Sequence, residues 1–436
     1  MNQQPNLYRE FFPYDEVPKI VFDDSYYKRN LPEDIWITDT TFRDGQQSMS
    51  TFTKKQIVTL FDYMHKIDNG AGVIRQTEFF LYNPHDRHAV EACRDRGYDF
   101  PQITSWIRAT KNDFELVKSM EISETGILMS CSDYHIFHKM GWDRDTAMKN
   151  YLEILEAALA SGVKPRCHFE DITRADIHGF VLPLAKKINE LGNQAGVKVK
   201  IRSCDTLGLG LPYNGAALPR SVPGIISLLQ SEAGFASDQL EWHGHNDYHA
   251  AVTNSTTAWL YGCAAISTTL LGIGERTGNT PLDGMLVEYM QLKGPSTLNL
   301  HYLSELADYF EKEMHYTISV KHPYIGIDFN STKAGIHADG ILKNEEVYNS
   351  FNTEKILNRP ILIQVNEYSG VAGVAAWINC YFKLKGDDKV KKTDEGVKKI
   401  KDAIDVQYKS GRASGMTNEE LRALVVDFLP QVCDID

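Results

Sequence analysis

Two histidines separated by one residue stand out in the segment Trp242–Asp247, which reads Trp-His-Gly-His-Asn-Asp. On a β-strand, residues two apart point to the same side, so the side chains of His243 and His245 would lie together. Two imidazoles can occupy neighbouring positions around one divalent cation, and a carboxylate from elsewhere would add an oxygen ligand. A His-x-His pair by itself is more often structural than metal-binding.

A dense polar cluster in the segment Thr38–Ser48 supplies such a carboxylate. It contains Arg43, Asp44 and a glycine immediately after them. Taken alone, the segment could be an ordinary capped loop between a strand and a helix. Together with the two histidines, Asp44 completes a set of two histidines and one carboxylate, which leaves positions on a metal open for substrate.

A third segment, Leu271–Asn279, is rich in glycine and carries Arg276 and Asn279. Glycine also serves simple turns, so a single G-x-G is weak evidence. A glycine-rich loop after the last strand of a barrel often cradles phosphate. We therefore expect Gly272, Gly274 and Arg276 to bind a phosphate group.

Eight short apolar runs, most of them followed by a helical stretch, would position these segments. The expected strands are Ile35–Thr38, Gly72–Thr77, Gln102–Trp106, Gly126–Ser130, Pro165–Phe169, Val197–Ser203, Gln239–Trp242 and Ala264–Leu270. The helical stretches between them include Lys54–Ile67, His85–Arg96, Asp143–Ala160, Ala175–Leu191 and Ala250–Tyr261. This alternation predicts an α/β protein with a (β/α)8 TIM barrel, and a doubly wound open sheet is the alternative. In a barrel the three polar segments fall at the carboxyl ends of strands, where active sites lie.

The rest of the chain predicts three regions. Residues 1–32 form an N-terminal extension without clear periodicity, and residues 33–297 form the catalytic barrel. Residues 298–436 form a smaller, mostly helical C-terminal domain, with a linker helix at Leu298–Glu313, a mixed segment, and helices at Val390–Tyr408 and Asn418–Phe428. A polar run, Lys385–Glu395, is expected to be a solvated linker.

The composition excludes several classes of function. The formal charge of −12 over 436 residues argues against a nucleic-acid surface. No apolar run is long enough for a membrane span, and the N-terminus lacks a signal pattern, so we expect a cytoplasmic protein. The seven cysteines include no C-x-x-C pair, which predicts reduced thiols rather than disulfides or a zinc ribbon.

Taken together, the motifs resemble those of the acyl-CoA condensing TIM-barrel metalloenzymes, the isopropylmalate, homocitrate and citramalate synthases and the Re-face citrate synthases. The segments at Asp39–Gln47, His243–Asp247 and Gly272–Asn279 resemble the family's D-T-T-x-R-D-G-x-Q, H-x-H-N-D and G-x-G-E-R-x-G-N signatures. Lys333–His337 resembles the K-A-G-I-H segment of the domain that follows the barrel. The four motifs occur in family order and span most of the chain.

This resemblance implies a divalent cation (Mn2+, Co2+, Mg2+ or Zn2+) held by Asp44, His243 and His245, with Asn279 in its outer shell. Arg43 would stabilise the alkoxide that forms when the ketone is attacked. The remaining polar positions would line the substrate pocket, namely Gln47, Arg108, His135 and Thr206. The resemblance therefore implies acetyl-CoA and a 2-oxo acid as partners, with Gly272, Gly274 and Arg276 binding the phosphates of coenzyme A.

The resemblance also implies that Glu170 is catalytic and that His337, from the appended domain of a partner subunit, assists removal of the methyl proton of acetyl-CoA. We therefore expect a homodimer or a higher homo-oligomer. Two departures from the family pattern stand out. His249 occupies a position where the family usually has glycine. Homocitrate synthases carry a catalytic tyrosine some way after the histidine of the K-A-G-I-H segment, but Asn358–Leu362 contains no tyrosine, and Tyr348 and Tyr368 only flank that stretch.

The residues expected at the barrel mouth favour one 2-oxo acid. Gln76, Glu78, Trp106, Arg108 and the segment Ser132–His135 are polar, which suits a second carboxylate better than an isopropyl group. We therefore favour oxaloacetate, giving citrate, and the resemblance is greatest to the Re-face citrate synthases. The chain also ends without room for the leucine-binding domain of long isopropylmalate synthases. Homocitrate synthase with 2-oxoglutarate, or isopropylmalate synthase with 2-oxoisovalerate, is the alternative.

Other classes lack a required residue. A lyase of the hydroxymethylglutaryl-CoA type needs a cysteine in the glycine-rich loop, and Gly272–Asn279 has none. A biotin-dependent carboxyltransferase needs a lysine ligand at a strand end, and an iron oxygenase with the same ligand count usually has a β-sandwich fold. A non-catalytic 2-oxo acid sensor is supported only by the missing tyrosine, and a complete set of reactive residues argues against it.

Overall fold

The computed structural model describes residues 4–108, 110–384 and 386–433. Residues 1–3 of the expected extension, and residues 385 and 434–436 of the expected C-terminal domain, lie outside these. The chain divides into two compact units, Met1–Leu298 and Asn299–Asp436.

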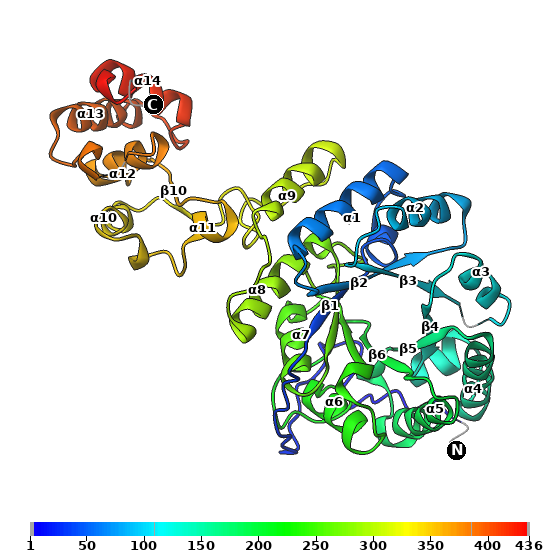
Figure 1. Cartoon of the computed structure of the whole chain (residues 1–436). Helices are drawn as coiled ribbons and strands as arrows, with labels where there is room; N and C mark the ends of the chain where they lie inside the picture. The colour runs from blue at the N-terminus through cyan, green and yellow to red at the C-terminus, as the bar shows by residue number, and fades with distance from the viewer. Residues whose placement is uncertain (1–3, 109, 385, 434–436) are drawn as a thin grey trace. The chain divides into compact units, whose positions relative to one another are not determined.

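Eight parallel strands close into a barrel in the first unit (Figure 1). They are β1 (Trp36–Asp39), β2 (Ile74–Phe80), β3 (Gln102–Ile107), β4 (Glu124–Ser130), β5 (Lys164–Glu170), β6 (Lys200–Asp205), β7 (Leu240–Gly244) and β8 (Ala265–Thr268). Pairing of β1 with β8, from Trp36 opposite Ala265 to Asp39 opposite Thr268, completes the ring. The predicted TIM barrel is confirmed, and a closed sheet excludes the open doubly wound alternative.

Helices cover the outside of the barrel. They are α1 (Lys54–Asp68), α2 (Pro84–Arg94), α3 (Asp113–Ser119), α4 (Arg144–Ser161), α5 (Leu182–Gln194), α6 (Val222–Ser231), α7 (Ala251–Leu260) and α8 (Leu282–Lys293). Local sequence fixes several starts: Thr53 and Gln56 form a capping box on α1, and Asp143 caps α4. Among the described residues, no helix is long and apolar enough to cross a membrane.

Alternation along the strands determines what fills the barrel. In β5, the apolar Cys167 and Phe169 are buried, while Arg166, His168 and Glu170 take part in polar contacts with other strands and with the loops at the mouth. The barrel interior is consequently ionic, and Arg166 and Arg202 are both fully buried. Buried charges of this kind require partners, which become part of the site described below.

The described part of the N-terminal extension, residues 4–32, has no regular helix or strand and lies against the barrel. Its backbone bonds to the loop before α6, with Ala217 N donating to Val21 O at 2.9 Å, and later to the end of α7, with Asn30 N donating to Leu260 O at 2.8 Å. It also reaches the loop after β4, where Asn6 N donates to Asp133 Oδ2 at 2.7 Å.

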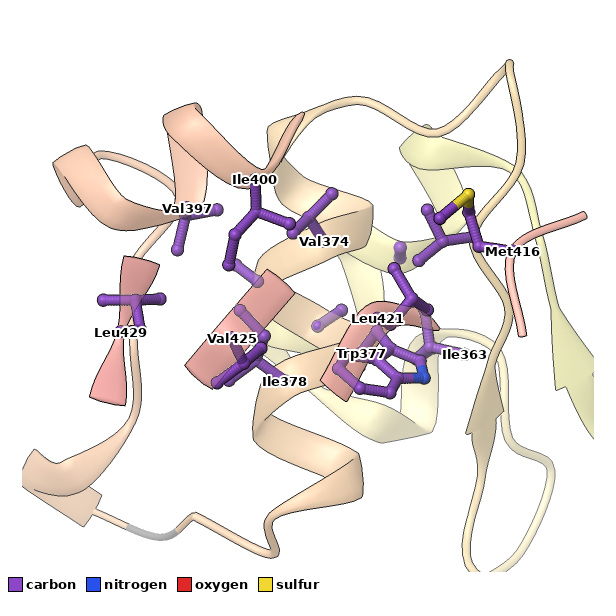
Figure 2. Packing of buried hydrophobic residues seen from close by; sticks show 14 of the residues in the cluster. Ile363, Val374, Trp377, Ile378, Val397, Ile400, Met416, Leu421, Val425 and Leu429 are labelled. Atoms are coloured by element: carbon purple, nitrogen blue, oxygen red, sulfur yellow. The ribbon is translucent and has the colours of Figure 1, made fainter. Parts of the chain in front are cut away.

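The second unit is mostly helical. It contains α9 (Tyr302–Glu313), α10 (Gly335–Lys343), α11 (Thr353–Leu357), α12 (Val371–Tyr381), α13 (Glu395–Lys409) and α14 (Asn418–Phe428), with the short parallel pair β9 (Ser331–Thr332) and β10 (Leu362–Ile363). Its own apolar core gathers around α12, where Trp377 and Ile378 meet Ile400 from α13 and Val425 from α14 (Figure 2).

Candidate functional site: a buried two-histidine, one-carboxylate centre

Asp44 follows β1, and His243 and His245 lie at the end of β7, on the same barrel mouth. The Nε2 atoms of the two histidines lie 3.3 Å apart. Asp44 Oδ2 lies 3.7 Å from His243 Nε2 and 3.6 Å from His245 Nε2. One ligand atom from each residue therefore converges on a single point, and all three residues are buried.

The protonation states of these groups suit a cation. Burial lowers the pKa of His243 well below its ordinary value, and burial also lowers that of His245, so both imidazoles are neutral near pH 7. Burial would raise the pKa of the Asp44 carboxyl, but the Arg43 guanidinium and the two histidines together hold it below its usual range. Neutral imidazoles and an ionised carboxylate are the forms that bind metals.

Unsatisfied polar atoms mark the same point. Asp44 Oδ2 is buried without a hydrogen-bond partner among the described residues, as is Asn279 Oδ1. His243 Nδ1 lies 3.1 Å from Ser267 Oγ, and a proton on that nitrogen leaves Nε2 free as a ligand. Buried acceptors normally have partners, so this donor set fits a divalent cation.

Arg43 is held beside Asp44 by a buried carboxylate. Its Nη1 lies 2.6 Å from Asp44 Oδ1, and its Nε donates to Glu78 Oε1 at 2.9 Å. Glu78 also accepts from Arg166 Nη2 at 2.6 Å and from Arg202 Nη1 at 2.9 Å. Three guanidinium groups share this one carboxylate, which fixes the orientation of Arg43.

The expectation that Gln76 lines the barrel mouth is wrong, and Glu78 lies fully buried beneath the mouth, against Arg43. Gln76 lies in a layer with Glu124 and Lys200, the first residues of their strands: its Nε2 is 3.3 Å from Glu124 Oε2, and Lys200 Nζ is 3.5 Å from its Oε1. Both Gln76 and Glu78 are buried in the ionic interior. Sequence alternation places them inside the barrel, but depth along β2 depends on strand register, which the sequence does not reveal.

The glycine-rich loop after β8 packs against the histidine strand. His245 and Asn279 form an antiparallel bridge, and Asn246 N donates to Gly278 O at 3.0 Å. A side chain at Gly274 would collide with the Asn279 amide, 2.1 Å from the added carbon. Glycine therefore lets the loop fold back so that Asn279 lies beside His245.

Arg276 is exposed, and its guanidinium bonds to two other loops at the barrel mouth. Its Nε donates to Asp247 Oδ1 at 2.8 Å, and its Nη2 donates to the carbonyl of Thr206 at 2.6 Å. The guanidinium thereby ties together the loops after β6, β7 and β8. Gly272 and Gly278 adopt positive φ angles in the same loop.

Glu170 ends β5 and forms a second polar cluster with the loop after β4. His135 Nδ1 lies 3.0 Å from Glu170 Oε2, and Lys139 Nζ lies 2.9 Å from Oε1. The Ser130 hydroxyl also donates to Glu170. Burial would raise the pKa of Glu170, but His135, Ser130 and Lys139 lower it to about 2, so the group is a carboxylate. Sequence reasoning had not singled out Lys139.

The other predicted pocket residues fall into two places. Thr206 Oγ1 accepts from Asp171 N at 2.9 Å, next to Glu170. Gln47 and Arg108 line a depression of about 380 Å3 with Trp106 and Tyr82, on the β2–β3 side of the mouth. Trp106 links this depression to the centre, because the Arg43 guanidinium lies 5.5 Å from its ring centroid.

The histidine that departs from the family pattern lies in the turn between β7 and α7. His249 is exposed and adopts a left-handed backbone with φ of 57°. Its backbone N donates to Asn246 O at 3.0 Å, which closes this turn.

In the second unit, His337 is exposed on α10 and contacts a tyrosine. The ring centroids of His337 and Tyr348 lie 4.3 Å apart. An added carbon at Gly340 would lie 2.7 Å from Tyr348 Cε2, so glycine there leaves room for the ring. No tyrosine lies in the expected stretch 358–362, and the turn after α10 instead brings Tyr348 beside His337, a contact that follows only from the fold.

Comparisons with known proteins agree with this geometry. Residues 34–309 match the family described as HMGL-like. The chain is 55% identical to Citrate (Re)-synthase of Clostridium kluyveri, over 99% of this chain and 95% of that protein. It is 49% identical to Citrate (Re)-synthase of Syntrophus aciditrophicus, over 98% and 68%, and 36% identical to 2-phosphinomethylmalate synthase of Streptomyces hygroscopicus, over 97% and 96%.

A solved structure shares the barrel. The HMG-CoA lyase of Bacillus subtilis aligns with a TM-score of 0.53 at 16% identity, over 66% of this chain and 96% of that one. At this identity the likeness concerns the fold alone.

Proposed function

The chain belongs to the HMGL-like family, and from that premise we propose that it condenses acetyl-CoA with oxaloacetate to give citrate and free coenzyme A. The observation that carries the proposal is the buried convergence of Asp44, His243 and His245 at the barrel mouth, in a chain whose relatives at 55% and 49% identity are Citrate (Re)-synthases. Both relatives align with nearly the whole of this chain. The two histidines and the carboxylate leave room for a substrate on the ion they would hold.

We propose that these three residues hold a divalent cation, one of Mn2+, Co2+, Mg2+ or Zn2+. When bound, such an ion polarises a carbonyl oxygen as a Lewis acid. Arg43 is fixed beside Asp44 and would stabilise negative charge on the ketone oxygen as the new bond forms. Asn279, with its carbonyl oxygen unsatisfied, would accept from a ligand in the outer shell.

The bond changes define what the other residues must do. A methyl C–H bond of acetyl-CoA breaks, the resulting carbanion attacks the ketone carbon, and the alkoxide takes a proton. Water then cleaves the thioester C–S bond and releases the thiol. We propose that Glu170 and His337 act in the first proton transfer, because Glu170 is held as a carboxylate and His337 is exposed to reach a substrate.

Binding of the oxaloacetate carboxylates is the remaining task. We propose His135 and Thr206 beside Glu170, and Gln47 and Arg108 on the opposite side of the mouth, as the polar groups that do this. The contacts of Gly272, Gly274 and Arg276 with coenzyme A stay a prediction.

We further propose that the working protein is at least a dimer, with His337 supplied by a partner subunit. This part rests on the resemblance of Lys333–His337 to the family's motif. Light scattering at the assay concentration tests it: full activity of a strictly monomeric protein would contradict it.

Release of free thiol from acetyl-CoA tests the reaction itself. The protein is assayed anaerobically with Mn2+ or Co2+ against oxaloacetate, 2-oxoglutarate, 2-oxoisovalerate and pyruvate. We expect release with oxaloacetate, formation of citrate in equal amount, and loss of release on adding a chelator. Release with another 2-oxo acid in preference would give the chain a different acceptor, and silence with all four would refute the condensation.

A further inference from the structure

A single turn of π-helix, Tyr134–Lys139, follows β4 at the barrel mouth. One of its wide backbone bonds runs from Met140 N to His135 O at 3.0 Å. π-Helical turns are rare and are concentrated at functional sites, because the extra residue re-aims the side chains around it. Here the turn directs both His135 and Lys139 to one carboxylate, that of Glu170.

Lys139 contacts both carboxylate oxygens of Glu170. Lys139 Nζ lies 2.9 Å from Oε1 and 3.0 Å from Oε2. The Lys139 side chain is 49% exposed and the Glu170 side chain 17%. Among the described residues, Lys139 is the only lysine or arginine paired with Glu170. Its ammonium group is therefore the permanent positive charge beside this mostly buried carboxylate.

The neighbouring carboxylate has a separate partner. Asp171 is fully buried and pairs with Arg174 Nη2 at 2.8 Å. His135 lies between the two acids, with Nε2 3.7 Å from Asp171 Oδ2. Arg174 therefore offsets Asp171, whereas Glu170 is faced by Lys139 together with His135 and Ser130.

The turn that carries Lys139 is anchored at its other end. Ile136 is fully buried, and Tyr134 OH donates to the carbonyl of Leu7 at 2.7 Å. Asp133, just before the turn, receives two bonds from Arg144, at 2.8 and 2.9 Å. An ordinary surface pair looks different: Lys149 on α4 lies 4.0 Å from Glu153 and its side chain is 75% exposed.

We propose that Lys139 is a positioning residue for the reaction, holding both oxygens of Glu170 so that this carboxylate is oriented for proton transfer from acetyl-CoA. The inference rests on the proposed function, because it requires that Glu170 take part in the reaction. It gives the π turn and the N-terminal segment that anchors it a task at the site.

Steady-state kinetics with three variants tests this. Lys139→Met removes the charge but keeps the length of the side chain, Lys139→Arg restores two donors, and Lys149→Met is the matched control. We expect Lys139→Met to lower kcat between about 10- and 100-fold, the cost of a misplaced catalytic group. KM for oxaloacetate should stay near the wild-type value, and Lys139→Arg should recover most of the lost activity.

A kinetic isotope effect separates positioning from folding. With acetyl-CoA deuterated at the methyl group, the isotope effect on kcat should be larger in Lys139→Met than in the wild type, because proton removal becomes slower. A merely misfolded fraction would lower kcat and leave the isotope effect unchanged. Wild-type kcat in Lys139→Met, or a loss matched by Lys149→Met, would overturn the inference.

Glu170→Gln shows which claim has failed. An inactive Glu170→Gln beside a fully active Lys139→Met would overturn only the role of Lys139. A fully active Glu170→Gln would instead refute the place of Glu170 in the proposed function.

Discussion

The barrel unit and the second unit hold their reactive residues in opposite ways. Asp44, His243 and His245 are buried, and each has polar neighbours from another strand or loop. His337 is exposed on α10, with the ring of Tyr348 beside it. Groups that stabilise developing charge must be fixed before the reaction, whereas a group that meets the substrate from outside must be accessible. Under the proposed function, the barrel binds and polarises the substrate, and the second unit delivers a proton-transfer group.

The largest effect is expected from Asp44→Asn, which keeps the shape but removes the charge. Losing an outer-shell partner typically lowers metal affinity or activity about 10–100-fold, and losing a direct ligand should lower them further. Thiol release should therefore fall to background. Mn2+ affinity, followed by electron paramagnetic resonance, should fall with it. Asp34→Asn, at an exposed pair with Arg75, is the control and should leave both unchanged. Unaltered Mn2+ binding in Asp44→Asn would place the metal elsewhere.

His337→Ala should have the second-largest effect, and it tests the role of the second unit. General acid–base groups contribute about 100- to 10,000-fold, so kcat should fall within that range. Because the barrel ligands are untouched, Mn2+ binding should stay as in the wild type. His301→Ala removes another exposed histidine of the second unit and should retain activity. Wild-type turnover in His337→Ala would remove the second unit from the chemistry.

Gly340→Ala should have a smaller effect and separates stability from activity. The added methyl would lie 2.7 Å from Tyr348 Cε2 and push that ring away from His337. Alanine is the better helix former by about 1 kcal/mol, so α10 itself should not be weakened. We expect kcat to fall by less than in His337→Ala, with no loss of helix content by circular dichroism. Gly370→Ala, which meets open space, is the control. Equal kcat in the two variants would mean that the contact with Tyr348 has no role.

The smallest effect is expected from Ile400→Val in the core of the second unit. Ile400 is fully buried there (Figure 2), and this change typically costs about 0.5–1.5 kcal/mol. The thermal transition of the second unit should shift down in calorimetry while Mn2+ binding and KM for oxaloacetate stay constant. A change in Mn2+ affinity would show that the second unit shapes the metal site.

Much of the barrel could be predicted from the sequence because strand alternation is a local signal. Each of the eight expected strands overlaps an observed one, and the polar segments follow β1, β7 and β8 as expected. The helices α3, α6, α8, α10, α11 and α12 were not singled out. Pro223 and Gly224 lie in the first turn of α6, and these residue types also mark loops. α12 is apolar on nearly every face, so its amphipathic period is weak.

Of the site, only the residues within the sequence motifs could be predicted. Asp44 lies far from His243 and His245 in the chain, and the convergence of the three follows from the closed barrel. Depth inside the barrel did not follow, which is why Gln76 was misplaced. Contacts made by loops were also not predicted. Lys139 contacts Glu170 because of the π turn, and Tyr348 contacts His337 because of the turn after α10. Such contacts depend on tertiary geometry that short sequence windows do not contain.

A mixing experiment tests the division between the two units most directly. Asp44→Ala has an intact His337, and His337→Ala has an intact barrel site, so each protein alone should be inactive. If a partner subunit supplies His337, unfolding and refolding the two together should restore about a quarter of wild-type thiol release, since half of the dimers are mixed and each has one complete site. No recovery, with mixed dimers shown to form, would contradict the account.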